Sequence, residues 1–116
     1  MLTRDDISRL SAEVFARHPM VSRAYLFGSY ARGEADESSD VDLCYDYDVS
    51  GEFAAPRGLA FFGEHGSMRE ELEHALGLPV DLLVTPREEM CLFSSQWGFA
   101  REVHRDKRRV YERQGL

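Results

Sequence analysis

The stretch GSYARGEADESSDVDL, residues 28–43, places a glycine turn and a serine ahead of two aspartates that are spaced one residue apart. Residues 21–27 before it (VSRAYLF) are rich in apolar and aromatic side chains, as expected of a strand. Residues 40–49 (DVDLCYDYDV) alternate polar and apolar positions and predict a second strand. Gly28 ends the first strand, residues 29–32 suffice for about one helical turn, and Gly33 stops that turn. The stretch therefore predicts two strands joined by a short helical turn and a polar loop.

A helix is predicted ahead of this unit, because Thr3 and Asp6 form a capping-box pattern before an apolar stripe. His18 and Pro19 end that helix. The stripe consists of Ile7, Leu10, Val14 and Phe15.

Beyond the second strand, residues 59–76 carry apolar side chains on one helical face. Gly63 and Gly66 interrupt this segment, so its first half is expected to be either helix or loop. Gly77 caps the helix, and residues 78–84 (LPVDLLV) predict a short buried strand. A final helix is predicted through Phe93, Trp97, Ala100 and Val103, followed by a closing strand at 108–113. The expected fold is a single α/β domain, residues 1–116, with a small mixed β-sheet flanked by helices.

The composition narrows the function classes. The chain has 116 residues, 43% hydrophobic and 30% charged, with a net charge of −7. Stable binding of a long nucleic acid is not expected from such an acidic chain, because that binding requires neutralisation of phosphates. No apolar run approaches the length of a membrane span, and the N-terminus lacks a signal-peptide pattern. Cys44 and Cys91 form no metal or redox motif, so a cytoplasmic protein with reduced thiols is expected. The four histidines show no ligand spacing, so no zinc site is expected.

Asp40 and Asp42 are the first candidates for chemistry. Because they share parity on a strand, their side chains leave one face about 6.6 Å apart. Mg²⁺ prefers carboxylate oxygens, and two such ions can activate an attacking hydroxyl and stabilise the departing oxygen in a phosphoryl displacement. Alternatively, the two aspartates only cap or flank the start of a strand.

Gly28 and Ser29 add a candidate phosphate site to the carboxylates. Gly28 permits a sharp turn and a close backbone approach. Ser29 stands at the start of a short helix, where free N–H groups and its own hydroxyl favour an anion. Alone, these two residues would indicate an ordinary helix cap. Together with Asp40 and Asp42, they describe a triphosphate held by backbone at one end and by metal at the other.

Asp81 is the candidate third carboxylate. It interrupts the apolar run of residues 80–84, where an uncompensated buried carboxylate would be costly. A neighbouring strand carrying Asp40 and Asp42 would give it a metal to bind, and the alternative is a carboxylate that reaches water at a strand end. Asp46 and Asp48 also share parity with the first pair, but Asp46 lies about 13 Å beyond Asp42. Both are expected to be solvated or edge charges.

These residues resemble the signature of the polymerase-beta-like nucleotidyltransferase superfamily, and most of all its minimal nucleotidyltransferases. The matching positions are Gly28, Ser29, Ala31, Arg32, Gly33, Ala35, Ser39, Asp40, Asp42 and Leu43, with Asp81 further on. The resemblance implies transfer of AMP from ATP to a hydroxyl, with Gly28 and Ser29 on the β- and γ-phosphates. It also implies that Asp40, Asp42 and Asp81 hold two Mg²⁺ ions, and that Asp81 helps to deprotonate the acceptor. For Arg32 it leaves open a phosphate contact or a surface salt bridge.

The resemblance also implies a partner. Minimal nucleotidyltransferases often pair with a HEPN-family ribonuclease toxin and, as antitoxins, AMPylate one of its tyrosines. Two alternatives stay open: a binding module that neutralises a partner without catalysis, or an adenylyltransferase of a small molecule such as an aminoglycoside, with the pocket built by a homo-oligomer. The loop around Phe53, Phe61 and Phe62 belongs either to the core or to a surface that faces a partner.

Overall fold

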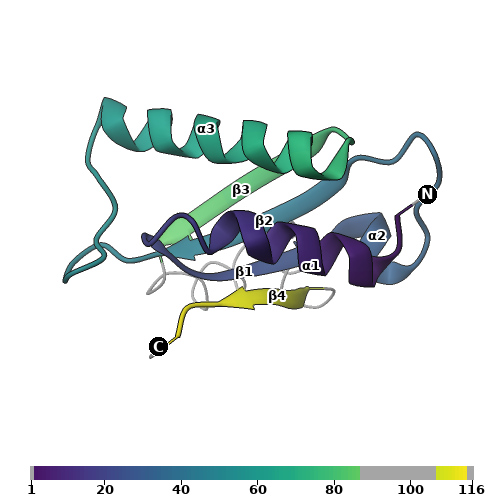
Figure 1. Cartoon of the computed structure of the whole chain (residues 1–116), viewed down its shortest axis with the longest axis horizontal. Coiled ribbons are helices and arrows are strands. Elements are labelled where there is room, and N and C mark those ends of the chain that lie inside the picture. Colours follow the sequence, from purple (N-terminus) through teal and green to yellow (C-terminus); the bar gives the residue numbers. More distant parts are fainter. Residues whose placement is uncertain (1, 87–106, 115–116) are drawn as a thin grey trace, which may run out of the picture.

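The computed structural model describes residues 2–86 and 107–114, which form helices and a mixed four-stranded sheet (Figure 1). The sheet has the order β3-β2-β1-β4. β1 pairs antiparallel with β2 and β4, whereas β2 and β3 are parallel. This arrangement confirms the predicted α/β fold with a small mixed sheet. The elements are α1 (Arg4–Phe15), β1 (Val21–Phe27), α2 (Gly28–Arg32), β2 (Val41–Tyr47), α3 (Leu59–Leu76), β3 (Val80–Pro86) and β4 (Arg108–Glu112).

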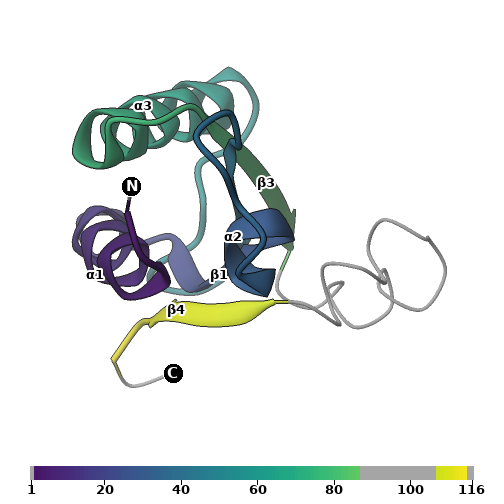
Figure 2. The ribbon, with the colours of Figure 1, turned by 90° about the vertical axis from the view of Figure 1, so that its right-hand side faces the viewer.

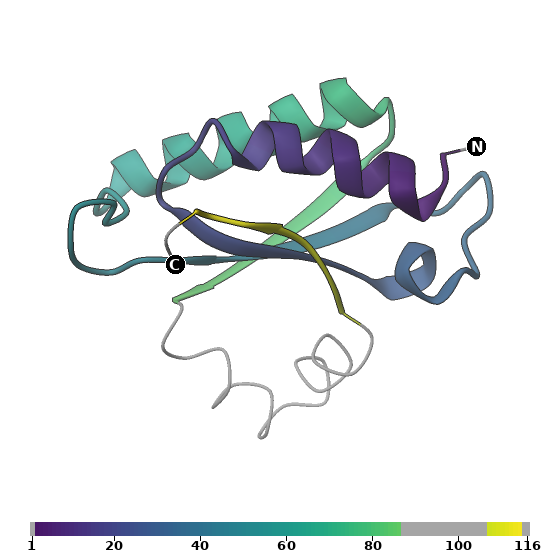
Figure 3. The ribbon, with the colours of Figure 1, turned by 60° about the horizontal axis from the view of Figure 1, so that its bottom comes forward.

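The long helices α1 and α3 lie side by side on one face of the sheet (Figures 2 and 3). Because side chains alternate along a strand, β2 sends Val41, Leu43 and Tyr45 into the core beneath these helices. Its intervening residues face the other side of the sheet. There, Cys44 packs with Tyr25 and Phe27 in a separate buried cluster. One face of β2 therefore packs in the main core beneath the helices, and the other packs in this separate cluster.

α1 begins with the predicted capping box, in which Asp6 N–H donates to Thr3 Oγ1 and Thr3 N–H donates to Asp6 Oδ2. The segment after α1 is fixed to α3 through a buried histidine. The ring nitrogens of His18 lie 2.6 Å from carboxylate oxygens of Glu64 and Glu71, respectively. Burial alone would raise the pKa of Glu71, but its hydrogen bonds with His18 and Arg17 hold that pKa below its ordinary value.

α3 is helical from Leu59 to Leu76, so the first half of this segment, which the sequence left as either helix or loop, is helix. A Cβ at Gly63 or Gly66 would meet nothing within 4 Å, so neither glycine marks a close backbone approach. Packing of the flanking residues outweighs the glycine penalty, which is about 1 kcal/mol each. Phe61 packs partly buried against the core. Phe53 and Phe62 are 39% and 69% exposed, so the aromatic residues of this region divide between core and surface.

The expectation of a short buried strand at 78–84 is wrong in part. β3 is one of the two edge strands of the described sheet. Val80 and Leu82 are buried, but Asp81 is exposed and Leu83 is 37% exposed. Side chains of α3 bind the backbone of this edge at two residues. Val80 N–H donates to Glu73 Oε2 at 3.0 Å, and the Leu82 backbone forms a hydrogen bond with His65.

The expectation that Asp46 and Asp48 are solvated or edge charges is also wrong. Asp46 is 2% exposed, and the Tyr25 hydroxyl donates to its Oδ2 at 3.3 Å. The side chain of Asp48 is 14% exposed and lies 2.6 Å from Arg113 Nη2. Tyr25 and Arg113 come from distant parts of the chain, which is why the strand pattern could not reveal them. Burial and the Asp46 charge raise the pKa of Tyr25 to about 12.

The expected closing strand is confirmed as β4, whereas the predicted helix through Phe93, Trp97, Ala100 and Val103 lies outside the described residues, as does Cys91. Cys44 is a buried free thiol, as expected. Among the helices that the structure describes, none combines the length and apolar character that crossing a membrane requires.

Candidate active site

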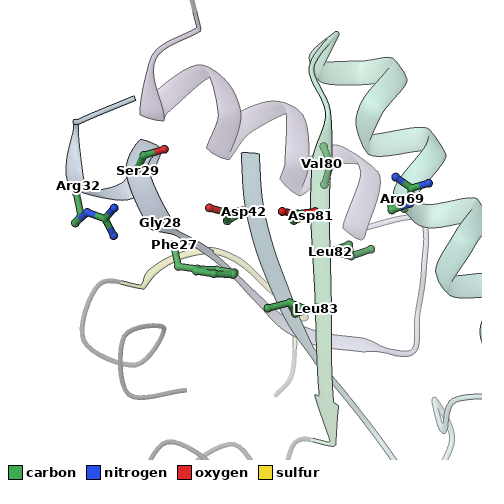
Figure 4. Close-up of a pocket in the computed structure, with 10 residues that line it drawn as sticks. All are labelled: Phe27, Gly28, Ser29, Arg32, Asp42, Arg69, Val80, Asp81, Leu82 and Leu83. Atoms are coloured by element: carbon green, nitrogen blue, oxygen red, sulfur yellow. The ribbon is translucent and has the colours of Figure 1, made fainter. Parts of the chain in front are cut away.

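The candidate catalytic residues form a row across three strands. Phe27, the last residue of β1, lies opposite Asp42 in the β1–β2 register, and Asp42 lies opposite Asp81 in the β2–β3 register. Gly28 and Ser29 continue directly from Phe27. These residues line a cleft of about 730 Å³ (Figure 4). The cleft thus brings together four of the side chains that the sequence analysis selected, Ser29, Arg32, Asp42 and Asp81, whereas Asp40 is not among its lining residues.

Gly28 is where backbone and carboxylate meet most closely. Its φ is +74°, and a Cβ added to it would lie 2.1 Å from Oδ2 of Asp42. A side chain at this position is therefore excluded twice, by backbone conformation and by the carboxylate itself. Glycine is required here because the turn into α2 passes directly against Asp42.

The electrostatics of the row show how closely its carboxylates are grouped. Burial raises the pKa of Asp42 to about 6, together with the charges of Asp81 and Asp40. The carboxyl group of Asp81 is also within hydrogen-bonding reach of Asp42. Asp40 is exposed and immediately precedes β2. Asp42 and Asp81 therefore line the cleft as a pair, and Asp40 adds a third negative charge beside them.

A turn at residues 36–39 delivers Asp40 to the start of β2. Asp36 Oδ1 accepts hydrogen bonds from the backbone and hydroxyl of Ser38, and Asp36 N–H donates to Ser39 Oγ. These hydrogen bonds hold the pKa of Asp36 below its ordinary value. The serines that precede Asp40 are thus structural in this loop.

Helix α2, which presents Ser29 to the cleft, is held in place by buried side chains and by two arginines. Tyr30 and Ala31 are buried, and Gly33 ends the helix in a left-handed conformation. The Ala31 carbonyl accepts hydrogen bonds from Arg4 at 3.1 Å and from Arg108 at 3.2 Å. Two cations from opposite ends of the chain thus brace the C-terminal end of α2, where they also complement the helix dipole. The sequence analysis missed both arginines.

Arginines stand at both ends of the cleft (Figure 4). Arg32 extends from α2, and its Nε donates to Glu34 Oε2 at 3.0 Å, so it lines the cleft and also makes a surface ion pair. Arg69 extends from α3 on the far side of Asp81. The sequence analysis did not select Arg69. The signal it missed is the spacing of His65, Arg69 and Glu73, which places all three on one helical face toward β3.

The donor set fits a hard cation that shares its coordination with a substrate. No group of three or more histidine, cysteine, aspartate or glutamate side chains able to hold a metal ion occurs within the parts of the chain that the structure describes. Mg²⁺, however, commonly takes one or two carboxylates and completes its shell with water and phosphate oxygens. A divalent cation would offset the charges of Asp81 and Asp40, which together with burial raise the pKa of Asp42. The pair Asp42 and Asp81 therefore suits Mg²⁺ bound together with a phosphorylated substrate.

Comparison with known proteins agrees with this geometry. A sequence profile of the nucleotidyltransferase domain matches residues 7–110. The chain belongs to the nucleotidyltransferase domain family. The predicted resemblance and enzyme class, nucleotidyl transfer, are thereby confirmed. This nucleotidyltransferase is 36% identical over 78 residues to a candidate protein adenylyltransferase of Methanocaldococcus jannaschii, a match that covers 67% of the chain and 71% of that protein. It is 44% identical over 59 residues to the protein adenylyltransferase MntA of Thermococcus cleftensis, 51% of the chain and 50% of that protein.

Solved structures show the same fold. A toxin–antitoxin structure with AMP-PNP superposes with a TM-score of 0.64 at 19% identity, over 92% of this nucleotidyltransferase and 74% of that chain. A second match, with a TM-score of 0.51 at 18% identity and the same coverage, is the tri-AMPylated HEPN toxin of Shewanella oneidensis in complex with its MNT antitoxin. At these identities the likeness concerns the fold.

Proposed function

We propose that residues 1–116 act as one domain that transfers AMP from ATP to a hydroxyl of a partner protein, a tyrosine of a HEPN-type toxin, and so serve as a cytoplasmic antitoxin. The observation that carries the proposal is the row of Gly28, Asp42 and Asp81 in one cleft. Family membership and the relatives named as protein adenylyltransferases support it. The solved complexes of related fold, one of them with AMP-PNP, support the nucleotide and the kind of partner.

In this mechanism Gly28 and Ser29 hold the β- and γ-phosphates through backbone N–H groups and the serine hydroxyl, and Arg32 adds a cation. Asp40, Asp42 and Asp81 would hold two Mg²⁺ ions, which supply activation of the acceptor hydroxyl and stabilisation of the leaving oxygen. The acceptor oxygen bonds to the α-phosphorus as the bond to pyrophosphate breaks. Asp81 takes up the proton of the acceptor hydroxyl, directly or through water.

Labelled ATP tests the proposal directly. We expect the purified protein, Mg²⁺ and the protein encoded by its genomic neighbour to give a labelled neighbour when the label is at the α-phosphate. The same label at the γ-phosphate should not transfer, because pyrophosphate leaves. Asp42→Ala should abolish labelling, whereas Asp5→Ala, which removes an exposed carboxylate from α1, should retain it. Undiminished labelling by Asp42→Ala would refute the proposed site.

The alternatives predict different outcomes. If the double variant Asp40→Ala/Asp42→Ala protects cells from the toxin as well as the wild type does, binding alone neutralises the partner. If the gene alone confers aminoglycoside resistance, the acceptor is a small molecule and a homo-oligomer must build its pocket.

A further inference from the structure

Arg69 lies along the edge of β3, between two side chains that bind the backbone of that strand. His65, Arg69 and Glu73 are spaced by one helical turn each and therefore share a face of α3. Val80 N–H donates to Glu73 and the Leu82 backbone forms a hydrogen bond with His65, which together fix α3 against the strand. Arg69 Nη1 lies 3.3 Å from Glu73 Oε2, and its side chain, 47% exposed, lines the cleft. The fold thus holds a cation at the end of the cleft that lies beyond Asp81.

The direction of the reaction assigns a side of the cleft to each reactant. In an in-line displacement the attacking oxygen and the leaving oxygen lie on opposite sides of the phosphorus. With the triphosphate on Gly28 and Ser29, pyrophosphate departs toward α2. The acceptor hydroxyl must then enter from the opposite side, past Asp81. Figure 4 shows Arg69 on that side of the row and Arg32 on the other.

The surface around Arg69 has the chemistry of a binding site for an acidic segment. The cleft is lined by the carboxylates of Asp42 and Asp81, and the whole chain carries a net charge of −7, so an anionic acceptor would otherwise be repelled. A guanidinium has five N–H donors, and the ion pair with Glu73 leaves donors for a second carboxylate. Leu83, 37% exposed, adds an apolar surface elsewhere in the cleft.

We infer that Arg69 binds an acidic group next to the acceptor hydroxyl and thereby selects the acceptor. This inference rests on the function proposed above, and it goes further by naming the class of acceptor: a tyrosine flanked by a carboxylate. Arg69 acts as a specificity-determining residue, and Arg32 serves as its counterpart on the pyrophosphate side.

Peptide acceptors test the inference. The substrates are acetyl-Gly-Glu-Tyr-Gly-amide and the same peptide with lysine or glutamine in place of glutamate. We expect the wild type to prefer the glutamate peptide over the lysine peptide by about tenfold in kcat/KM, the size of one charge-assisted contact. Arg69→Gln should remove the preference through a higher KM for the glutamate peptide. Arg69→Glu should favour the lysine peptide. Arg32→Gln, the matched control, should raise the KM for ATP and keep the preference. An unchanged preference in Arg69→Gln, or an effect on the KM for ATP instead, would overturn the inference.

A binding measurement separates this inference from the proposed function. Fluorescence anisotropy of the labelled peptides is measured with protein, Mg²⁺ and a nucleotide whose α,β-bridging oxygen is replaced by methylene. If AMP transfer to every peptide and to the neighbour protein is absent, the proposed function fails. Tighter binding of the glutamate peptide that is lost in Arg69→Gln still supports the acidic-group site. Equal affinities for the glutamate and lysine peptides refute it, whatever the outcome for transfer. Thermal unfolding of both arginine variants confirms that they fold.

Discussion

A Cβ on Gly28 would lie 2.1 Å from the carboxylate of Asp42, so the turn into α2 and the central carboxylate are fitted to each other. This contact joins the proposed phosphate side of the cleft to the proposed metal side. The Asp42 carboxylate can take its position only because Gly28 has no side chain. Substitution at Gly28 should therefore affect the chemistry as well as the fold.

Gly28→Ala should lower AMP transfer by about a hundredfold or more, because displacing a reacting group by about 1 Å has an effect of that size. It should also lower the free energy of unfolding by about 1 kcal/mol, since φ is +74°. Gly77→Ala is the matched control: its φ is +68°, and a Cβ there would meet nothing within 4 Å. The control should share the loss of stability but retain activity. Equal activity losses in both variants would show that backbone strain, not the contact with Asp42, is responsible.

Asp42→Asn should stabilise the metal-free protein at neutral and alkaline pH. Because burial and the neighbouring aspartates raise the pKa of Asp42 to about 6, the folded state binds more protons than the unfolded state between pH 4 and 6. The free energy of unfolding therefore falls as pH rises through this window, and asparagine removes the penalty. After allowance for solvent screening, the gain at pH 8 should be about 1 kcal/mol and should vanish at pH 4.

Denaturant unfolding in EDTA at both pH values measures this gain. Addition of Mg²⁺ with ATP at pH 8 should stabilise the wild type but not Asp42→Asn. A variant less stable than the wild type at pH 8 in EDTA would contradict the repulsion described above.

His18→Gln should lower the free energy of unfolding by about 2 kcal/mol near neutral pH, because hydrogen bonds to charged groups contribute on this scale and His18 bridges Glu64 and Glu71. The pKa of Glu71 is held below its ordinary value of 4.5, so its share of the stability is present above that pH and is lost as pH falls further. The difference between wild type and variant should therefore narrow below pH 4. Arg17→Gln, which removes a more exposed partner of Glu71, should cost less than about 0.5 kcal/mol. Equal costs for both variants would assign the stability to charge alone.

Phe61 and Phe62 should differ in their response to truncation although they are adjacent. Phe61→Ala removes a side chain that packs on the core and should cost about 2 kcal/mol. Phe62 is 69% exposed, so Phe62→Ala should change the free energy of unfolding by less than about 0.5 kcal/mol. Thermal or chemical unfolding of the two variants compares them directly. A loss at Phe62 as large as that at Phe61 would mean that another part of the molecule covers it.

Local signals predicted most of the architecture. The residues of β1, the capping box of α1 and the pairing of Asp42 with Asp81 follow from strand parity, caps and the cost of an isolated carboxylate in an apolar run. What the sequence could not predict depends on contacts between distant segments. Asp46 is buried with a hydrogen bond from Tyr25 of β1, and Asp48 forms an ion pair with Arg113, the residue that follows β4. Arg69 reaches the cleft because α3 stays helical through two glycines, against local propensity.

The alternation along β2 restricts how this protein can diverge. Val41, Leu43 and Tyr45 enter the core from one side of the strand, and Asp42 enters the cleft from the other. Inserting or deleting a single residue in β2 would reverse both sides at once, with carboxylates beneath the helices and core side chains facing the cleft. Lineages that keep this strand are thus expected to accumulate exchanges of residues there, never a change in its length.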